Sequence, residues 1–268
     1  MRAASHLLRA IGLVAVAALA LTVVAPAQAD DTTVRGVIAA DGQRQWISCT
    51  GTGSPTVVLA AGLGSSHTMW SIVVPRIEKR TRVCVYDRPG LGSSPARRGS
   101  KTTNAGKHAR ELRALLAAAG ESGPFVLVGH SYAGLVVRAF AAQAPREVAG
   151  MMLLDAVYPG IQRTFLASYR GPWHEGGTLI NMNASERATR GGPDLGDTPL
   201  MVITAGRPGN GTAWADRKWN REQARSATLS TDAQHWIARK SGHVVQRDQP
   251  AIVVRGVDWL LARARSGG

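Results

Sequence analysis

The chain has 268 residues, of which 44% are hydrophobic and only two are cysteine, and this composition suits one large domain or two small ones with a sizeable core. The formal net charge is +14, but the basic residues are scattered, with Pro95-Ala96-Arg97-Arg98 standing out and no aromatic residues interleaved, which argues against nucleic acid as a partner. The cysteines are far apart and no two histidines share the helical spacing of metal ligands, so we expect neither a metal nor another cofactor.

The first 29 residues have the pattern of a secretory signal peptide. Arg2 and Arg9 precede an uncharged apolar run over residues 11–24, and Ala27-Gln28-Ala29 offers a small-x-small cleavage site. The run is shorter than the ~20 residues that cross a bilayer, so an uncleaved membrane anchor is the weaker alternative. We expect a mature chain of residues 30–268, secreted to the extracellular space or cell envelope without stable membrane insertion. Losing the two arginines lowers its net charge to +12.

After the leader, strand-like runs alternate with helix-like segments. Residues 33–49 predict a hairpin that turns at Asp41-Gly42. The runs that follow are short and continuously apolar, as in strands buried on both faces of a parallel sheet. The alternation predicts an α/β fold with helices on both faces. The expected strands are residues 55–62, 81–87, 124–130, 148–156, 199–206 and 233–238, and the expected helices include 67–80, 105–120, 132–145 and 213–226.

Residues 156–198 interrupt the alternation. The segment is rich in Gly, Pro, Asn and Arg and stands between two predicted strands. We interpret it as a small lid inserted over the carboxyl end of the sheet; a long surface loop is the alternative.

One serine stands where a predicted strand turns into a predicted helix. Ser131 lies in Gly129-His130-Ser131-Tyr132-Ala133-Gly134. So tight a corner strains the serine backbone and requires small residues two positions to either side, here Gly129 and Ala133. The helix N-terminus also stabilises negative charge at this point. We therefore predict that Ser131 is a nucleophile; an ordinary N-cap serine is the alternative.

A serine nucleophile needs a base, and the base needs an acid that orients it. His243 follows the late strand and precedes the terminal helix, so a loop there returns its imidazole across the carboxyl end of the sheet. Asp155 ends the strand that follows the serine. We predict His243 as the base and Asp155 as the acid, with Asp216 as the alternative acid and a loop-capping role as the alternative for Asp155.

The same chemistry requires two backbone N–H groups that bind a developing oxyanion. Tyr132, directly after the serine, supplies one candidate. Leu63, between Gly62 and Gly64 after an earlier strand, supplies the other, since the glycines let that backbone approach a substrate closely. An ordinary strand-to-helix turn is the alternative for this loop.

The segments AGLGSSHTMW, YDRPGLGSS, GHSYAG, LLDAVYP and SGHVVQRDQP together resemble the α/β-hydrolase family, with Ser, Asp and His in the family's order over residues 51–250. The resemblance is greatest to the esterase, haloperoxidase and proline-iminopeptidase-like branch. It implies a mostly parallel eight-stranded sheet with helices on both faces. The chain departs from the family pattern in three places: Ala61 replaces a common His, Ala133 replaces the second Gly of the serine motif, and Asp155 follows the sixth strand, as in haloalkane dehalogenases, rather than the seventh.

The resemblance also implies a pairing for the two cysteines. The family's strand order places the strands that hold Cys49 and Cys84 side by side, and an exported protein meets oxidising conditions. We therefore expect a cross-strand disulfide.

The function that these residues predict is a secreted serine hydrolase acting on small-molecule carboxylic esters. Trp70 and Trp173 are candidates for the substrate pocket, with ordinary packing as the alternative for both. An amide or peptide hydrolase of the same fold and a non-catalytic binding module are the competing functions. The sequence leaves the natural substrate and the oligomeric state open.

Overall fold

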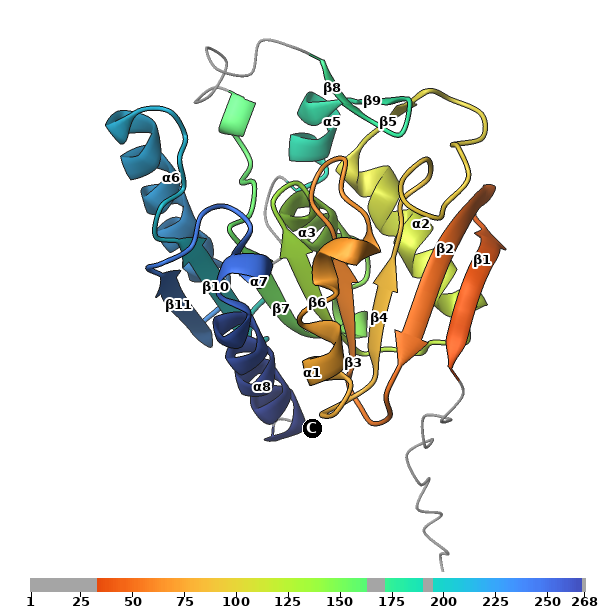
Figure 1. The fold of residues 1–268 in the computed structure, drawn as a ribbon, viewed down its shortest axis with the longest axis horizontal. Helices are drawn as coiled ribbons and strands as arrows, with labels where there is room; N and C mark the ends of the chain where they lie inside the picture. The colour runs from red at the N-terminus through yellow and green to blue at the C-terminus, as the bar shows by residue number, and fades with distance from the viewer. Residues whose placement is uncertain (1–32, 163–171, 190–194, 267–268) are drawn as a thin grey trace, which may run out of the picture.

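The computed structural model describes residues 33–162, 172–189 and 195–266 (Figure 1). The predicted signal peptide and parts of the predicted lid lie outside these ranges. Within them, no helix has both the length and the apolar character needed to cross a membrane.

A central sheet of eight strands organises the fold, in the order β1-β2-β4-β3-β6-β7-β10-β11. The pairs β1–β2 and β2–β4 are antiparallel and all other pairs are parallel. This confirms the predicted fold class. The strands are β1 (Val34–Ala40), β2 (Gln43–Thr50), β3 (Thr56–Ala60), β4 (Val83–Tyr86), β6 (Phe125–His130), β7 (Val148–Leu154), β10 (Leu200–Ala205) and β11 (Ala233–Ala238).

The first two strands form the predicted hairpin. Ala40 pairs with Gln43 across a two-residue turn. Asp41 and Gly42 both have positive φ, 47° and 70°, as the tight turns that match the twist of a hairpin require.

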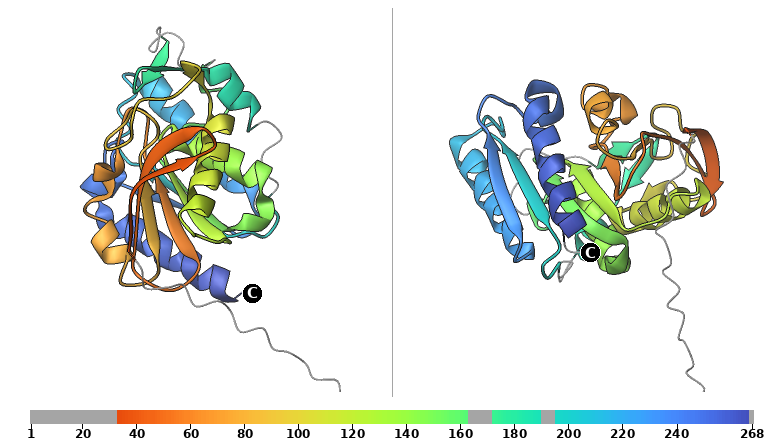
Figure 2. Two further views of the ribbon diagram at one scale, coloured as in Figure 1. Left: turned by 90° about the vertical axis from the view of Figure 1, so that its right-hand side faces the viewer. Right: turned by 90° about the horizontal axis from the view of Figure 1, so that it is seen from below.

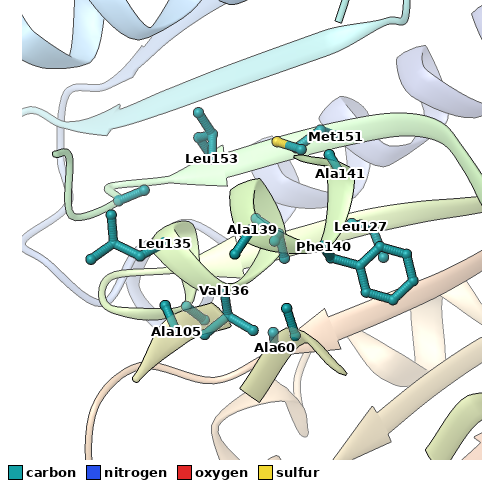
Figure 3. Packing of buried hydrophobic residues seen from close by; sticks show 14 of the residues in the cluster. Ala60, Ala105, Leu127, Leu135, Val136, Ala139, Phe140, Ala141, Met151 and Leu153 are labelled. Carbon is teal, nitrogen blue, oxygen red and sulfur yellow. The ribbon is translucent and has the colours of Figure 1, made fainter. Parts of the chain in front are cut away.

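Helices cover both faces of the sheet (Figure 2). Along the buried strands, side chains alternate between the two layers of core. In β6, Leu127 belongs to the core under α2 and α3, while Val126 and Val128 belong to the core under α8. Figure 3 shows the first of these layers, where Phe140 of α3 lies near Leu127. The helices are α1 (Val74–Ile77), α2 (Ala105–Ala118), α3 (Ala133–Gln143), α6 (Ala213–Ser226), α7 (Val245–Asp248) and α8 (Pro250–Ser266).

The helix expected over residues 67–80 is largely absent. A 3₁₀ turn, η1 (His67–Trp70), and the four-residue α1 take its place. Two features explain the short helix: Val73 and Val74 lose side-chain rotamer freedom in a helix, and Pro75 lacks the N–H that a longer helix would use.

Part of the predicted lid forms a second, small sheet. The hairpin of β8 (Trp173–Glu175) and β9 (Thr178–Ile180) pairs with β5 (Thr102–Thr103), and α5 (Met182–Arg187) follows it. Figure 1 shows this sheet and α5 beyond the carboxyl ends of the central strands.

Candidate active site

Ser131 occupies the sharp corner between β6 and α3. Its φ is 53°, in the left-handed region, which a non-glycine residue rarely adopts without functional reason. A Cβ on Gly129 would lie 2.6 Å from the carbonyl oxygen of Ala133, and one on Gly134 would lie 2.5 Å from the Cβ of Ala156. The corner thus requires glycine at 129 and 134 and accommodates the methyl group of Ala133.

The structure brings Ser131, His243 and Asp155 into one hydrogen-bonded chain. His243 lies in the loop between β11 and α7, with Nε2 2.9 Å from Oγ of Ser131 and Nδ1 2.6 Å from Oδ2 of Asp155. Because a carboxylate only accepts hydrogen bonds, Nδ1 carries the proton and Nε2 accepts from the serine hydroxyl. Asp216 makes no such contact: it lies in the first turn of α6, and its Oδ1 accepts from the amide of Asn210 in the loop before that helix.

Asp155 is completely buried and has the left-handed φ of 40°. Its Oδ1 accepts hydrogen bonds from the amide of Ala205 (3.0 Å), at the end of β10, and from Nε1 of Trp219 (2.8 Å), in α6. These donors hold the carboxylate so that Oδ2 faces His243. Sequence reasoning missed Trp219, although an indole within the polar helix 213–226 was a signal that one face of this helix is buried.

His130 supports the loop that carries His243. Its Nε2 donates to the carbonyl oxygen of His243 at 2.9 Å. Burial, together with the nearby His243, lowers the pKa of His130 to about 4, so this imidazole is neutral near pH 7. A neutral ring with its proton on Nε2 fixes the position of the His243 backbone without adding a charge beside it.

The loop that contains Leu63 lies against the serine corner. A Cβ on Gly62 would lie 3.2 Å from Cβ of Ser131 and 2.9 Å from Nδ1 of His130, so only glycine permits this approach. Within the described ranges, the amides of Leu63 and Tyr132 donate to no acceptor. Two free N–H groups therefore lie in the loop and the corner that meet at the serine.

A cavity of about 230 Å³ opens beside Ser131 and His243. Trp173 is among the residues that line this cavity. Trp70 is not: it is completely buried in the core under α8, because η1 turns its indole inward, and the packing alternative holds for it. The other lining residues are Val157, Ile161, Pro208, Gly209, Asn210 and Trp219.

Cys49 and Cys84 form the expected disulfide. They are directly opposite each other in the register of β2 and β4, with sulfur atoms 2.04 Å apart.

An eight-stranded α/β sheet that carries a serine on a strained corner at its carboxyl edge is the arrangement of α/β hydrolases. The sequence model of the alpha/beta hydrolase fold family matches residues 55–263. The chain belongs to this family.

Relatives in sequence include YqjL of Bacillus subtilis, 28% identical over 211 residues that cover 76% of this chain and 82% of YqjL. A pimeloyl-[acyl-carrier protein] methyl ester esterase of Sodalis glossinidius is 32% identical over 128 residues, 45% of this chain and 47% of the esterase. A Klebsiella pneumoniae protein named "Putative carbamate hydrolase RutD" is 32% identical over 125 residues, 44% of this chain and 45% of that protein. The latter two thus match over about half their lengths.

Solved structures share the fold at lower identity. An esterase from Thermogutta terrifontis superposes with a TM-score of 0.63 at 20% identity, over 87% of this chain and 99% of the esterase. The haloalkane dehalogenase DatA from Agrobacterium tumefaciens also superposes with a TM-score of 0.63, at 16% identity, over 87% of this chain and 98% of the dehalogenase. Since both chemistries match equally well, the branch within the family stays a prediction.

Proposed function

We propose that this protein is an exported serine hydrolase that cleaves carboxylic esters through an acyl-enzyme on Ser131. The observation that carries the proposal is the continuous hydrogen-bonded chain from Ser131 through His243 to the buried carboxylate of Asp155. The haloalkane dehalogenase neighbours share only the fold, and a serine in the nucleophile position favours acyl transfer over displacement of a halide.

In the proposed reaction, His243 removes the hydroxyl proton of Ser131 as Oγ attacks the ester carbonyl carbon. Asp155 stabilises the imidazolium that forms. His243 then donates that proton to the leaving alcohol as the carbon–oxygen bond breaks. A water molecule, deprotonated by His243, attacks the acyl-enzyme and releases the carboxylic acid and the free serine.

The free amides of Leu63 and Tyr132 are the proposed donors to the tetrahedral oxyanion. Such preorganised N–H groups stabilise charge that appears only in the transition state, and the loss of one donor typically costs ~10²–10³-fold in kcat. The left-handed backbone of Ser131 supports this assignment, because it exposes the amide of the following residue at the corner.

The cavity beside Ser131 favours a small substrate group. Its volume of about 230 Å³ and its walls of Trp173, Ile161 and Val157 suit a short apolar acyl or alcohol group. The sequence relative named as a methyl ester esterase favours esters, whereas the relative named "Putative carbamate hydrolase RutD" keeps amide-like substrates as the second candidate.

Export is supported by the disulfide, since such bonds persist mainly in oxidising compartments. The basic and apolar leader of residues 1–29 supports it independently.

The test is to incubate the mature protein with a fluorophosphonate probe and to locate the adduct by peptide mass spectrometry, with Ser131→Ala as the control. We expect one adduct, on Ser131, that is absent from the control. A panel of short-chain esters and aminoacyl amides then separates the two substrate classes. A folded protein that forms no adduct would disprove the proposed mechanism and favour the non-catalytic binding module.

A further inference from the structure

A buried ion pair that the proposed reaction does not use lies directly behind the Leu63 loop. Arg88, just after β4, donates from Nε to Oε1 of Glu175 and from Nη2 to Oε2, both at 2.7 Å. Both side chains are only 2% exposed. Glu175 ends β8, so the pair joins the central sheet to the small lid sheet.

Among the described residues, the other side-chain hydrogen bonds of this pair go to the backbone on either side of Leu63. Arg88 donates from Nη1 to the carbonyl of Ala61 (2.6 Å) and from Nη2 to the carbonyl of Gly62 (2.7 Å). Oε2 of Glu175 accepts from the amide of Gly64 at 3.1 Å. The ion pair therefore holds the carbonyl groups of Ala61 and Gly62 and the amide of Gly64. The amide of Leu63 itself donates to no acceptor within the described residues.

The charges make these contacts strong. Burial alone raises the pKa of Glu175, but Arg88, aided by His108 and the amide of Gly64, lowers it to about 2. The carboxylate is therefore ionised throughout the range in which a hydrolase is assayed. Hydrogen bonds with one ionised partner are roughly twice as strong as neutral ones, and here they fix a loop whose glycines would otherwise leave it flexible.

The lid hairpin contacts the Arg88 loop through backbone as well as side chains. A Cβ on Gly90 would lie 2.4 Å from the carbonyl oxygen of Gly176. The turn of the hairpin therefore packs against the loop that carries Arg88. This packing places the carboxylate of Glu175 opposite the guanidinium of Arg88.

We propose that Arg88 and Glu175 are positioning residues that hold the Leu63 amide where the substrate oxyanion forms, so that the β8–β9 hairpin is a structural part of the active site. This proposal rests on the proposed function. It predicts that breaking the pair lowers the rate of the chemical step, because a displacement of about 1 Å in a catalytic group can cost roughly 10²-fold.

The chain offers a matched control in a second buried ion pair. Arg97 donates from Nη1 and Nη2 to the two carboxylate oxygens of Glu111 at 2.6 and 2.7 Å, and both side chains are 1% exposed. None of their hydrogen bonds goes to residues 61–64. A change in this pair reports the cost of disrupting a buried ion pair without disturbing the Leu63 loop.

The experiment compares Glu175→Gln with Glu111→Gln. In the first variant one carboxylate oxygen becomes a donor. An amide nitrogen in place of Oε1 loses the contact with Nε of Arg88, and one in place of Oε2 loses the contacts with Nη2 of Arg88 and with the amide of Gly64. Where single changes leave too little folded protein, the double variants Arg88→Met/Glu175→Leu and Arg97→Met/Glu111→Leu remove both charges of each pair together, which folded proteins tolerate better than an unpaired buried charge.

We expect kcat of the Arg88 and Glu175 variants to fall about 10- to 100-fold, with KM for a short-chain ester changed by less than about threefold. Binding of a trifluoromethyl ketone, whose hemiketal oxygen mimics the oxyanion, should weaken by a similar factor. The Arg97 and Glu111 variants should keep the wild-type kcat and the wild-type affinity for the ketone while losing thermal stability. Equal kcat in the two sets at a temperature where all are folded would overturn the proposal. Failure of the proposed function is distinguishable, because wild-type Ser131 would then form no fluorophosphonate adduct.

Discussion

The imidazole Nδ1 of His243 lies 2.6 Å from Oδ2 of Asp155, a residue 88 positions earlier in the chain. This contact favours Asp155 over Asp216 as the proposed acid. Asp155→Asn should lower kcat by roughly 10⁴-fold, because an amide stabilises neither the required tautomer nor the imidazolium. Asp216→Asn should leave kcat within about threefold, since Asp216 contacts a loop amide instead. Steady-state ester hydrolysis checks both, and similar losses in the two variants would contradict the assignment.

Trp219 holds the other oxygen of that carboxylate. Trp219→Phe keeps an aromatic ring but removes the Nε1–H donor to Oδ1 of Asp155. A hydrogen bond to a charged group contributes roughly 1.5–3 kcal/mol, so we expect kcat to fall by about tenfold or more with the fold intact. Circular dichroism confirms folding. Unchanged kcat would show that the amide of Ala205 alone orients Asp155.

Two glycines of the lid hairpin allow the effect of packing on kcat to be measured apart from the effect of backbone strain. Gly176 and Gly177 both have positive φ, 52° and 72°, but only a Cβ at 176 would meet a neighbour, the backbone of Gly90, at 2.7 Å. Gly176→Ala should displace Glu175 and lower kcat about tenfold. Gly177→Ala should cost ~1 kcal/mol of stability with kcat retained. Identical kinetics in the two alanine variants would count against coupling between the hairpin and the active site.

The disulfide should stabilise the fold without contributing to the chemical step. Cys49 and Cys84 are 35 residues apart, and closing a loop of that size stabilises a protein by about 4 kcal/mol in the chain-entropy account. A Cys49→Ala/Cys84→Ala variant should unfold at lower urea concentration with kcat unchanged at 25 °C. Thiol titration of the denatured, unreduced wild type should find no free thiol; two titratable thiols would contradict the disulfide.

Two buried histidines should make the protein less stable in acid. Burial lowers the pKa of His108 to about 3, and burial with the nearby His243 lowers that of His130 to about 4, from a usual value of 6.5. Between pH 6.5 and 4 the unfolded chain therefore binds more protons than the folded one. The free energy of unfolding should fall with decreasing pH by about 1.4 kcal/mol per unit for each histidine.

Urea titrations at pH 8, 7, 6 and 5 measure this slope. The variant His108→Gln removes one of the two titrations, so its stability should depend less steeply on pH below 6.5. A slope equal to that of the wild type would show that His108 does not stay neutral in the folded state.

Local patterns in the sequence were sufficient to predict a parallel α/β sheet and to select Ser131, His243 and Asp155, which the structure joins in one hydrogen-bonded chain; the eight-stranded arrangement came from the resemblance to the family. Continuous apolar runs such as residues 124–130 indicate buried strands wherever they occur, and the small residues around Ser131 mark a corner that few other sequences can form. Predicting the disulfide required more than a local pattern, because only the strand order implied by the family placed Cys49 beside Cys84.

The supporting contacts could not be predicted in the same way. Arg88 and Glu175 are 87 residues apart, and Trp219 and Asp155 are 64 apart. Pairing between such distant side chains depends on how the lid and α6 fold back over the sheet, which no periodicity encodes. The misassigned Trp70 illustrates the same limit, because an aromatic residue after a catalytic loop has the same sequence pattern whether its ring faces substrate or the core.

The end of β10 carries no catalytic side chain, since Ala205 contributes only a backbone amide to Asp155. The residues that follow it, Pro208, Gly209 and Asn210, instead form one wall of the cavity. These three residues therefore belong to a segment that contributes none of the three proposed proton-transfer residues Ser131, His243 and Asp155. A library that randomises these three positions should therefore change which substrates are accepted while leaving the hydrogen-bonded chain of Ser131, His243 and Asp155 in place.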